Sequence, residues 1–273
     1  MRKGSELLAK ERQAYILERV RERGAVRVSD LTRALAVSDM TVRRDLDLLA
    51  GQGLLDKVHG GATAPGRTST DEPGFETKSA RERDEKDAIA RVAAGMVRPG
   101  SAIGLSAGTT TWTLAHRLLD VSGITVVTNS VQIATVFYQS PRPDQTIVLT
   151  GGVRTPSDAL VGPVAVATLR SLNLDLVFLG VHGMDEHTGF TSPNLLEAET
   201  SRALARSARR LAVVTDHTKW GVVGISTIAT LPEADVVITD SGLDPEATAM
   251  LTEQVGEVMI APMPAEQFST GAS

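Results

Sequence analysis

The stretch Val37-Ser-Asp-Met-Thr-Val-Arg-Arg-Asp-Leu46 decides the fold of the N-terminal part of the chain. Either Ser38 or Asp39 can cap a helix that starts here. An apolar face recurs at i, i+4 and i+7 of that helix, on Val42, Leu46 and Leu49. The opposite face carries longer side chains, namely those of Met40, Arg43, Arg44 and Asp47. The stretch therefore predicts a helix that packs on one side and is open to a partner on the other.

Two further helices precede this one. The first covers residues 11–23 and stops at Gly24. The second begins after Ser29, a favourable N-cap residue. Its buried residues are expected to be Leu31, Ala34 and Leu35. Three short helices in this order predict a helix-turn-helix unit.

A short hairpin follows the third helix. After Gly53 the chain reads Leu54-Leu-Asp-Lys-Val-His-Gly-Gly61, which predicts two strands with Lys57 and His59 exposed. Gly60 and Gly61 supply the backbone freedom that a hairpin tip needs. With this β-wing, the segment predicts a winged helix-turn-helix domain.

The exposed face of the third helix has the chemistry of a DNA reader. A recognition helix enters the major groove with its first residues against the base edges. Arginine donates to guanine O6 and N7, while threonine and methionine meet the thymine methyl group. The candidate DNA contacts are Ser38, Met40, Thr41, Arg43 and Arg44, together with Lys57 and His59 of the wing. From periodicity alone, a three-helix protein-interaction module with a solvated charged face is the alternative.

Composition and charge agree with a DNA-binding head on a larger body. The chain has 273 residues, which is enough for two domains, and it has no cysteine. Residues 1–68 hold 13 Lys and Arg against 9 Asp and Glu, whereas the remainder holds 15 against 24. A polyanion is therefore expected to meet the head. We expect no disulfide, no metal site, no cofactor and no membrane segment, and the lack of cysteine fits a reducing cytoplasm.

The rest of the chain predicts an α/β domain. We divide the chain into a winged helix-turn-helix domain at 1–63, a linker at 64–74, an α/β domain at 75–262 and a disordered tail at 263–273. Short apolar runs that alternate with helices predict a mostly parallel, doubly wound sheet with helices on both faces. The expected strands are 102–105, 124–128, 146–149, 174–179, 211–215, 236–239 and 258–260.

Polar and glycine-rich loops follow five of these strands, where open α/β sheets bind their ligands. The first is Leu105-Ser-Ala-Gly-Thr-Thr110, a strand-to-helix turn whose free N–H groups and hydroxyls suit an anion. An ordinary capped turn is the alternative at any one loop. The candidate effector-binding residues are Gly108, Thr109, Thr110, Thr128, Asn129, Gly151, Gly152, Gly180, His182, Glu197 and Lys219.

Several literal strings resemble the DeoR family of transcriptional regulators. They include Arg12-Gln-Ala-Tyr-Ile-Leu17, the core Ser-x-x-Thr-Val-Arg-Arg-Asp-Leu of the opening stretch, and His59-Gly-Gly-Ala62. In the second domain, Asp216-His-Thr-Lys219 matches the family's Asp-x-[Ser/Thr]-Lys. The resemblance implies a homo-oligomeric repressor, a dimer or a tetramer, that binds double-stranded operator DNA. It also implies an effector domain similar to ribose-5-phosphate isomerase, and hence a sugar phosphate as effector.

Two departures from the related patterns bear on activity and ligand. The isomerases carry an acidic pair where this chain reads Gly180-Val-His-Gly183, so an enzyme with Glu197 as its base is the minor alternative. The DeoR pattern has Asp and Ser where this chain has Ser106 and Ala107. That change predicts an effector, or a pocket, that differs from those of typical relatives.

Overall fold

A computed structural model describes residues 9–23, 25–58, 61–63 and 74–263 of the chain. The chain divides into two compact units, Met1–Asp71 and Glu72–Ser273. The expected linker and tail lie outside the described residues, apart from Gly74 and Met263. None of the described helices is long and apolar enough to cross a membrane.

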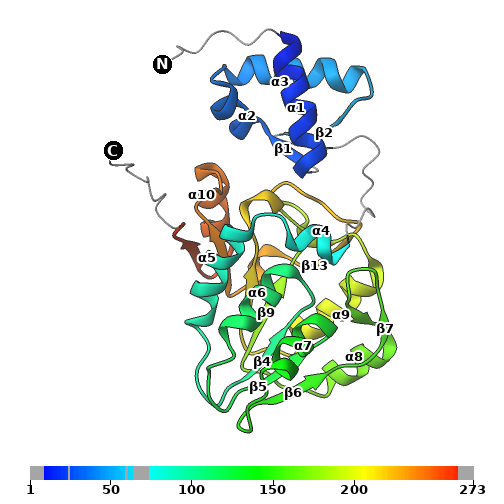
Figure 1. Cartoon of the computed structure of the whole chain (residues 1–273), viewed down its shortest axis with the longest axis vertical. Helices are drawn as coiled ribbons and strands as arrows, with labels where there is room; N and C mark the ends of the chain where they lie inside the picture. The colour runs from blue at the N-terminus through cyan, green and yellow to red at the C-terminus, as the bar shows by residue number, and fades with distance from the viewer. Residues whose placement is uncertain (1–8, 24, 59–60, 64–73, 264–273) are drawn as a thin grey trace, which may run out of the picture. The chain divides into compact units, whose positions relative to one another are not determined.

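The N-terminal unit contains three helices and a three-stranded sheet (Figure 1). In chain order these are α1 (Ala9–Arg23), β1 (Ala25–Arg27), α2 (Val28–Leu35), α3 (Asp39–Gly51), β2 (Asp56–Val58) and β3 (Gly61–Thr63). The strands are antiparallel in the order β1-β3-β2. The apolar stripes of the helices form one core that includes Ile16, Val20, Leu31, Val42, Leu46 and Leu49.

Some local predictions for this unit were wrong. Helix α2 begins at Val28, one residue before the predicted cap Ser29, and its N-cap Arg27 makes no side-chain cap bond. Ala34 is exposed, whereas Leu31 and Leu35 are buried. A Cβ on Gly61 would lie 2.1 Å from the carbonyl oxygen of Val26. Gly61 is therefore required by the close approach of β1, a strand that was not predicted.

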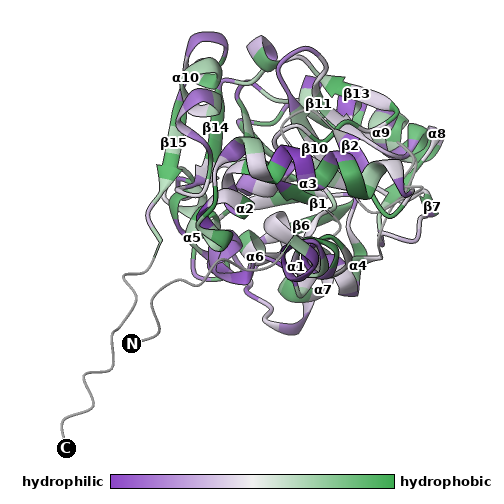
Figure 2. Ribbon diagram, turned by 90° about the horizontal axis from the view of Figure 1, so that it is seen from above, coloured by the Kyte–Doolittle hydropathy of each residue, from purple (hydrophilic) through white to green (hydrophobic). Residues whose placement is uncertain are grey.

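The C-terminal unit is built on a seven-stranded, fully parallel sheet in the order β15-β14-β12-β9-β4-β5-β6. Its strands are β4 (Ala102–Leu105), β5 (Thr125–Thr128), β6 (Thr146–Leu149), β9 (Leu176–Gly180), β12 (Leu211–Val214), β14 (Val236–Asp240) and β15 (Val258–Ala261). Central strands are buried on both faces, which explains their unbroken apolar runs. Figure 2 shows this apolar character along β14 and β15.

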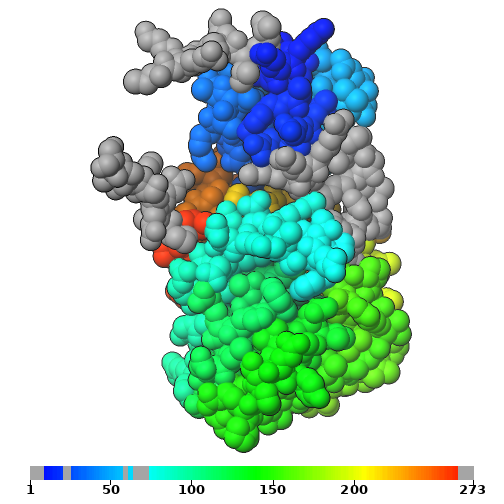
Figure 3. Space-filling model, in the orientation of Figure 1, coloured from blue at the N-terminus to red at the C-terminus, as the bar shows by residue number. Residues whose placement is uncertain are grey.

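Helices cover both faces of this sheet. One apolar core joins the sheet to α5 (Arg83–Ala94), α6 (Thr109–Arg117) and α7 (Val131–Gln139). Figure 3 shows one face of the unit covered by this cyan to green part of the chain. The second core joins the sheet to α8 (Pro163–Arg170), α9 (Leu195–Arg206) and α10 (Pro245–Gln254). The predicted fold class is confirmed.

Shorter elements decorate the loops of this sheet and were not predicted. They are the helix α4 (Phe75–Ser79), the hairpin of β7 (Val153–Arg154) and β8 (Leu160–Val161), and a small antiparallel sheet of β10 (Gly183–Asp185), β11 (Gly189–Ser192) and β13 (Ser226–Ala229). Both the hairpin and the small sheet lie in loops that follow carboxyl ends of the main strands. They therefore enclose the edge at which the candidate effector residues lie.

Candidate functional site

Ser38 is the N-cap of α3. Its hydroxyl accepts a bond from the Thr41 amide at 3.2 Å, and its Oγ lies 2.8 Å from Thr41 Oγ1. Both polar side chains are thus tied to the first turn, which holds that turn in helical form. Met40 is 69% exposed. The early residues of α3 stand where the sequence predicted, with Ser38 and not Asp39 as the cap.

The exposed face of α3 carries Arg43 and Arg44. Arg43 Nε donates to Asp39 Oδ2 at 3.0 Å, and both side chains are more than half exposed. Such a surface pair is weak, so the guanidinium can exchange it for a base edge. Lys57 of the wing is paired with Asp47 of α3. His59, the other predicted wing contact, lies outside the described residues.

A buried ion pair locks α3 to α1, and the sequence reasoning missed it. Arg12 Nε donates to Asp45 Oδ2 at 2.7 Å, and the second guanidinium nitrogen reaches Oδ1 at 3.2 Å. The amide of Gln13 donates to the same carboxylate at 3.0 Å. Asp45 is 5% exposed. The helical spacing could have predicted that Asp45 is buried, because it lies three residues after Val42 and therefore on the apolar face of α3.

In the C-terminal unit, the turn after β4 lies against the end of β9. The amide of Gly180 donates to Ser106 Oγ at 2.9 Å, and a Cβ on Gly108 would lie 3.9 Å from Gly180 Cα. Ser106 is buried. Ser106 is one of the two positions where the chain departs from the DeoR pattern. Its hydroxyl therefore joins the turn after β4 to the end of β9. Helix α6 starts from this turn with Thr109 and Thr110, which are both buried.

Thr128 and Asn129 hold the same turn from the neighbouring strand. Thr128 Oγ1 donates to the carbonyl of Leu105 at 2.7 Å. Asn129 Oδ1 accepts from the Ala107 amide at 2.8 Å, and its Nδ2 donates to the Leu160 carbonyl at 3.2 Å. Both side chains are buried. Their bonds position the turn, and the ligand contact predicted for both residues stays a prediction.

Gly151 and Gly152 shape the hairpin of β7 and β8. Both have positive φ, +72° and +122°. A Cβ on Gly152 would lie 2.5 Å from the carbonyl oxygen of Val161 in β8. The two glycines are therefore needed for the close return of the chain after β6.

Glu197 fastens this hairpin to α9. Its Oε1 accepts from Thr155 and, at 3.0 Å, from Ser157. The half-buried His182 follows β9, and its amide donates to the Thr191 carbonyl at 3.1 Å. Glu197 thus joins two elements around the candidate site.

Charged side chains gather at the end of β12. Asp216 accepts from the Thr218 hydroxyl and, at 3.1 Å, from its amide. Burial alone would raise the pKa of Asp216, but Lys219, Thr218 and Lys86 together lower it below its ordinary value. The carboxylate is therefore kept ionised between two lysines.

Lys86 of α5 is the second residue that sequence reasoning missed. Its Nζ donates to the carbonyl of Lys78 at 2.7 Å and to that of Arg81, and the residue is 5% exposed. Burial lowers the pKa of Lys86 to about 8, against the attraction of Asp216. The helical spacing could again have predicted burial, since Lys86 lies three residues before Ile89 on the buried face of the helix.

A histidine–carboxylate pair lies beside this cluster. His217 Nδ1 lies 2.7 Å from Asp240 Oδ2, and the His217 amide donates to Oδ1 at 2.8 Å. Burial raises the pKa of Asp240, but the bonds from His217 outweigh it and hold that pKa low. The pair fixes the 3-10 turn His217–Lys219 that carries Lys219.

Profiles of two known domains match these two units. The DeoR-like helix-turn-helix domain matches residues 12–68, and the DeoR C terminal sensor domain matches residues 81–241. The chain belongs to the DeoR family. It is thus a transcriptional regulator with a DNA-binding and a sensor domain, as the resemblance predicted.

Named DeoR-family relatives agree over nearly the whole length. The HTH-type transcriptional regulator YgbI of Escherichia coli (strain K12) is 38% identical over 92% of this chain and 97% of its own. The glycerol-3-phosphate regulon repressor of the same organism is 31% identical over 89% of this chain and 95% of its own. Both relatives are named as transcriptional regulators, and neither name supports the minor enzyme alternative.

Solved structures show only a distant likeness. A ribose 5-phosphate isomerase from Methanocaldococcus jannaschii shares 17% identity at a TM-score of 0.38, over 50% of this chain and 54% of its own. A translation initiation factor eIF-2B of Pyrococcus horikoshii OT3 shares 14% at 0.39, over 82% and 77%. Values of this size leave ligand and activity open.

Proposed function

We propose that this regulator is a cytoplasmic repressor of carbohydrate or related metabolism whose DNA binding is controlled by a phosphorylated sugar or a similar metabolite. In this proposal, residues 1–63 are the DNA-binding domain, 64–74 the linker, 75–262 the sensor domain and 263–273 the tail. The observation that carries the proposal is a solvent-exposed helix face with Arg43 and Arg44 on it, on a helix that a buried ion pair fixes from behind. The relative named as a glycerol-3-phosphate regulon repressor supports a phosphorylated effector.

For DNA, the proposed contacts are Met40, Thr41, Arg43 and Arg44 of α3, with Ser38 at its cap and Lys57 and His59 in the wing. Arg43 and Arg44 are exposed and belong to the first two turns of the helix. A helix inserted by its N-terminal end brings such residues to base edges. Each bidentate arginine–guanine pair contributes about 1–3 kcal/mol of discrimination.

For the effector, we propose an anion site at the carboxyl edge of β12, β9, β4 and β5, which are neighbours in the sheet. Lys219 and Lys86 both act on the buried carboxylate of Asp216, and the neighbouring Asp240 is bonded to His217. Amides of Gly108, Thr109 and Thr110 begin α6 at the same edge, where the helix dipole favours an anion. Gly180, His182 and Glu197 complete the proposed effector contacts. The remaining candidate residues lie in the loops that border the proposed anion site, namely Thr128, Asn129, Gly151 and Gly152.

Lys86 also connects this site to the start of the sensor domain. Its two carbonyl acceptors lie at the end of α4 and in the turn before α5. In that turn Glu82 has φ of +46°, a conformation that costs a non-glycine residue energy. Phe75 of α4 packs edge-on against Trp112 of α6, with ring centroids 5.8 Å apart. An anion that attracts Lys86 would weaken its hold on this strained turn and on the end of α4, the helix that follows the linker in the chain.

Fluorescence anisotropy tests this function directly. DNA from upstream of the protein's own gene is titrated with the full chain at fixed salt, then with glycerol 3-phosphate, ribose 5-phosphate and other sugar phosphates. We expect selective binding that one of these phosphates releases. Arg43→Ala with Arg44→Ala removes DNA binding, and Lys219→Met removes release alone. Arg98→Ala is the matched control, because this exposed cation precedes β4, at the opposite sheet edge. Absence of selective DNA binding overturns the proposal.

A further inference from the structure

Strand β6 ends the seven-stranded sheet, and in the described part of the chain only β5 pairs with it. Its outer edge therefore presents backbone N–H and C=O groups to solvent. Proteins protect such edges with lysine, proline or a covering loop. Thr146-Ile-Val-Leu149 contains no charged residue and no proline. This edge is chemically ready to pair with another strand.

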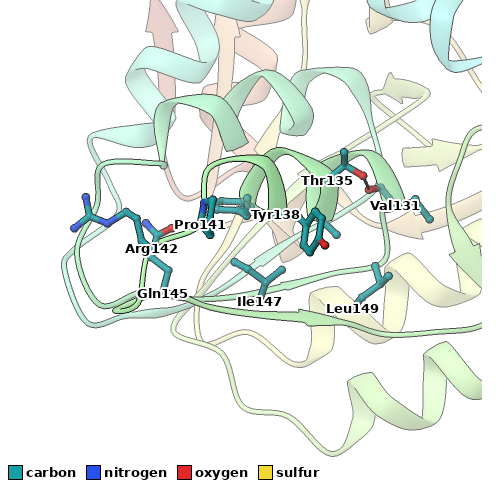
Figure 4. A pocket seen from close by; sticks show the side chains of 10 residues that line it. Val131, Thr135, Tyr138, Pro141, Arg142, Gln145, Ile147 and Leu149 are labelled. Atoms are coloured by element: carbon teal, nitrogen blue, oxygen red, sulfur yellow. Dashed lines mark hydrogen bonds between the residues drawn. The ribbon is translucent and has the colours of Figure 1, made fainter.

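Exposed apolar side chains surround the same edge. Tyr138 of α7 is 84% exposed, Val153 69%, Val164 61% and Leu149 43%. Between α7 and β6 lies an open groove of about 430 Å³, lined by Tyr138, Ile147 and Leu149 among others. Figure 4 shows the Tyr138 ring beside the side chains of Ile147 and Leu149. None of the proposed effector-binding residues lines this groove.

We propose that this edge is the dimer interface, with β6 of one copy pairing antiparallel with β6 of a second copy. A two-fold axis through the middle of β6 matches the surface to itself, as an isologous interface requires. The two β6 strands then hydrogen-bond to each other through their backbone groups, and the sheets of the two copies form one continuous sheet. The exposed side chains of α7 and β6 meet those of the second copy across the seam, which removes them from water.

Charge favours a second copy at this surface over others. Residues 69–273 hold 24 Asp and Glu against 15 Lys and Arg, so two sensor domains carry net charge of the same sign. The strand β6 is uncharged, and the one charged residue of the groove, Arg142, is bonded to Asp144 of its own loop at 3.0 Å. A contact between two copies centred on β6 therefore brings no like charges of strand or groove directly together.

The opposite edge of the sheet supplies a matched control. Strand β15 also has one pairing partner among the described strands, and Ile260 is 41% exposed, close to the value for Leu149. Glu257 directly precedes this strand, and the tail follows it. Ile260→Lys thus tests the effect of a new charge on an edge strand that we do not assign to the interface.

Light scattering after size exclusion tests the interface on the full chain without DNA or effector, so its outcome is independent of the proposed function. We expect twice the chain mass of 28.9 kDa, or an even multiple. Leu149→Lys and, separately, Tyr138→Lys should halve the mass, whereas Ile260→Lys should leave it unchanged. Circular dichroism confirms that each variant is folded. A monomeric wild-type chain overturns the proposal, and so does a Leu149→Lys variant of undiminished mass.

Chemical crosslinking gives a second, positive readout. The chain has no cysteine, so Leu149→Cys introduces a single thiol. A short bismaleimide should join two copies of this variant, and Ile260→Cys should remain uncrosslinked under the same conditions. Crosslinking at Ile260 alone would contradict the assignment.

Discussion

At the residue scale, the two ionisable side chains buried within apolar helix faces have distinct tasks. Asp45 joins α3 to α1 through Arg12, and Asp45→Asn removes that carboxylate charge. Because breaking a buried pair costs about 3–5 kcal/mol and the Arg12 side chain retains some exposure, we expect a loss of about 2 kcal/mol. Denaturant unfolding followed by circular dichroism measures it.

The control for Asp45 is its neighbour on the exposed face. Asp47 and Lys57 are paired but exposed, so Asp47→Asn should change stability by less than about 0.5 kcal/mol. Both tryptophans, Trp112 and Trp220, belong to the sensor unit. Tryptophan fluorescence should therefore report an unchanged transition in both variants. Equal losses from Asp45→Asn and Asp47→Asn would show that burial does not set the cost.

Lys86 predicts a pH dependence of effector response. With a pKa of about 8, the ammonium is charged at pH 7 and mostly neutral at pH 9. A phosphate monoester is already a dianion in this range, since its second pKa is about 6. Only the charged lysine attracts it, so the effector affinity should fall up to about tenfold between pH 7 and pH 9. Release of operator DNA by sugar phosphate, titrated at pH 7, 8 and 9, measures the change.

Lys86→Met separates this effect from others. The variant should bind the effector weakly at pH 7 and show little further loss at pH 9. Because it also lacks the bonds from Nζ to the carbonyls of Lys78 and Arg81, its DNA binding without effector should already be reduced. The same pH dependence in wild type and variant would exclude Lys86 as its origin.

At the element scale, α2 and α3 differ in how they begin. Ser38 caps α3, whereas Ser29 lies inside α2 and caps nothing. Ser38→Ala should cost about 1 kcal/mol of stability. It should also weaken DNA binding, because the first turn carries Met40 and Thr41. Ser29→Ala is the matched control and should leave both stability and DNA binding unchanged. A cost for Ser29→Ala as large as that for Ser38→Ala would contradict the assignment.

The main elements were predictable because local pattern and tertiary environment agree. The seven strands of the parallel sheet are short, mostly apolar runs, and the central strands among them are buried on both faces. The missed strands β1, β7, β8, β10, β11 and β13 have two to four residues and depend on partners distant in sequence. The α2 start was missed because packing of Val28 outweighed the capping preference of Ser29.

The sequence could predict at which edge of the sheet the candidate site lies. It could predict less well what each residue does there. Strand ends identified the edge of the sheet, and they identified Lys219 there. Spacing does not reveal that Asn129 uses its amide to hold the Ala107 turn, or that Ser106 bonds to Gly180. Lys86 was missed because it lies on a helix before the first strand, and only the folded chain brings it to Asp216.

At the scale of the whole molecule, the proposed dimer gives the DNA-binding function its avidity. Two linked heads on a palindromic operator bind the second half-site intramolecularly, which raises affinity about 10²–10⁴-fold. The monomeric Leu149→Lys variant should lose that factor on palindromic DNA, and the slope of log affinity against log salt should be about half as steep. On DNA with a single half-site, the variant and the wild-type chain should bind alike, because α3 is intact in both. Anisotropy on both DNAs measures these differences. A loss on the single half-site as large as that on the palindrome would mean that the substitution damages the head itself, whereas equal palindrome binding would mean that one head suffices.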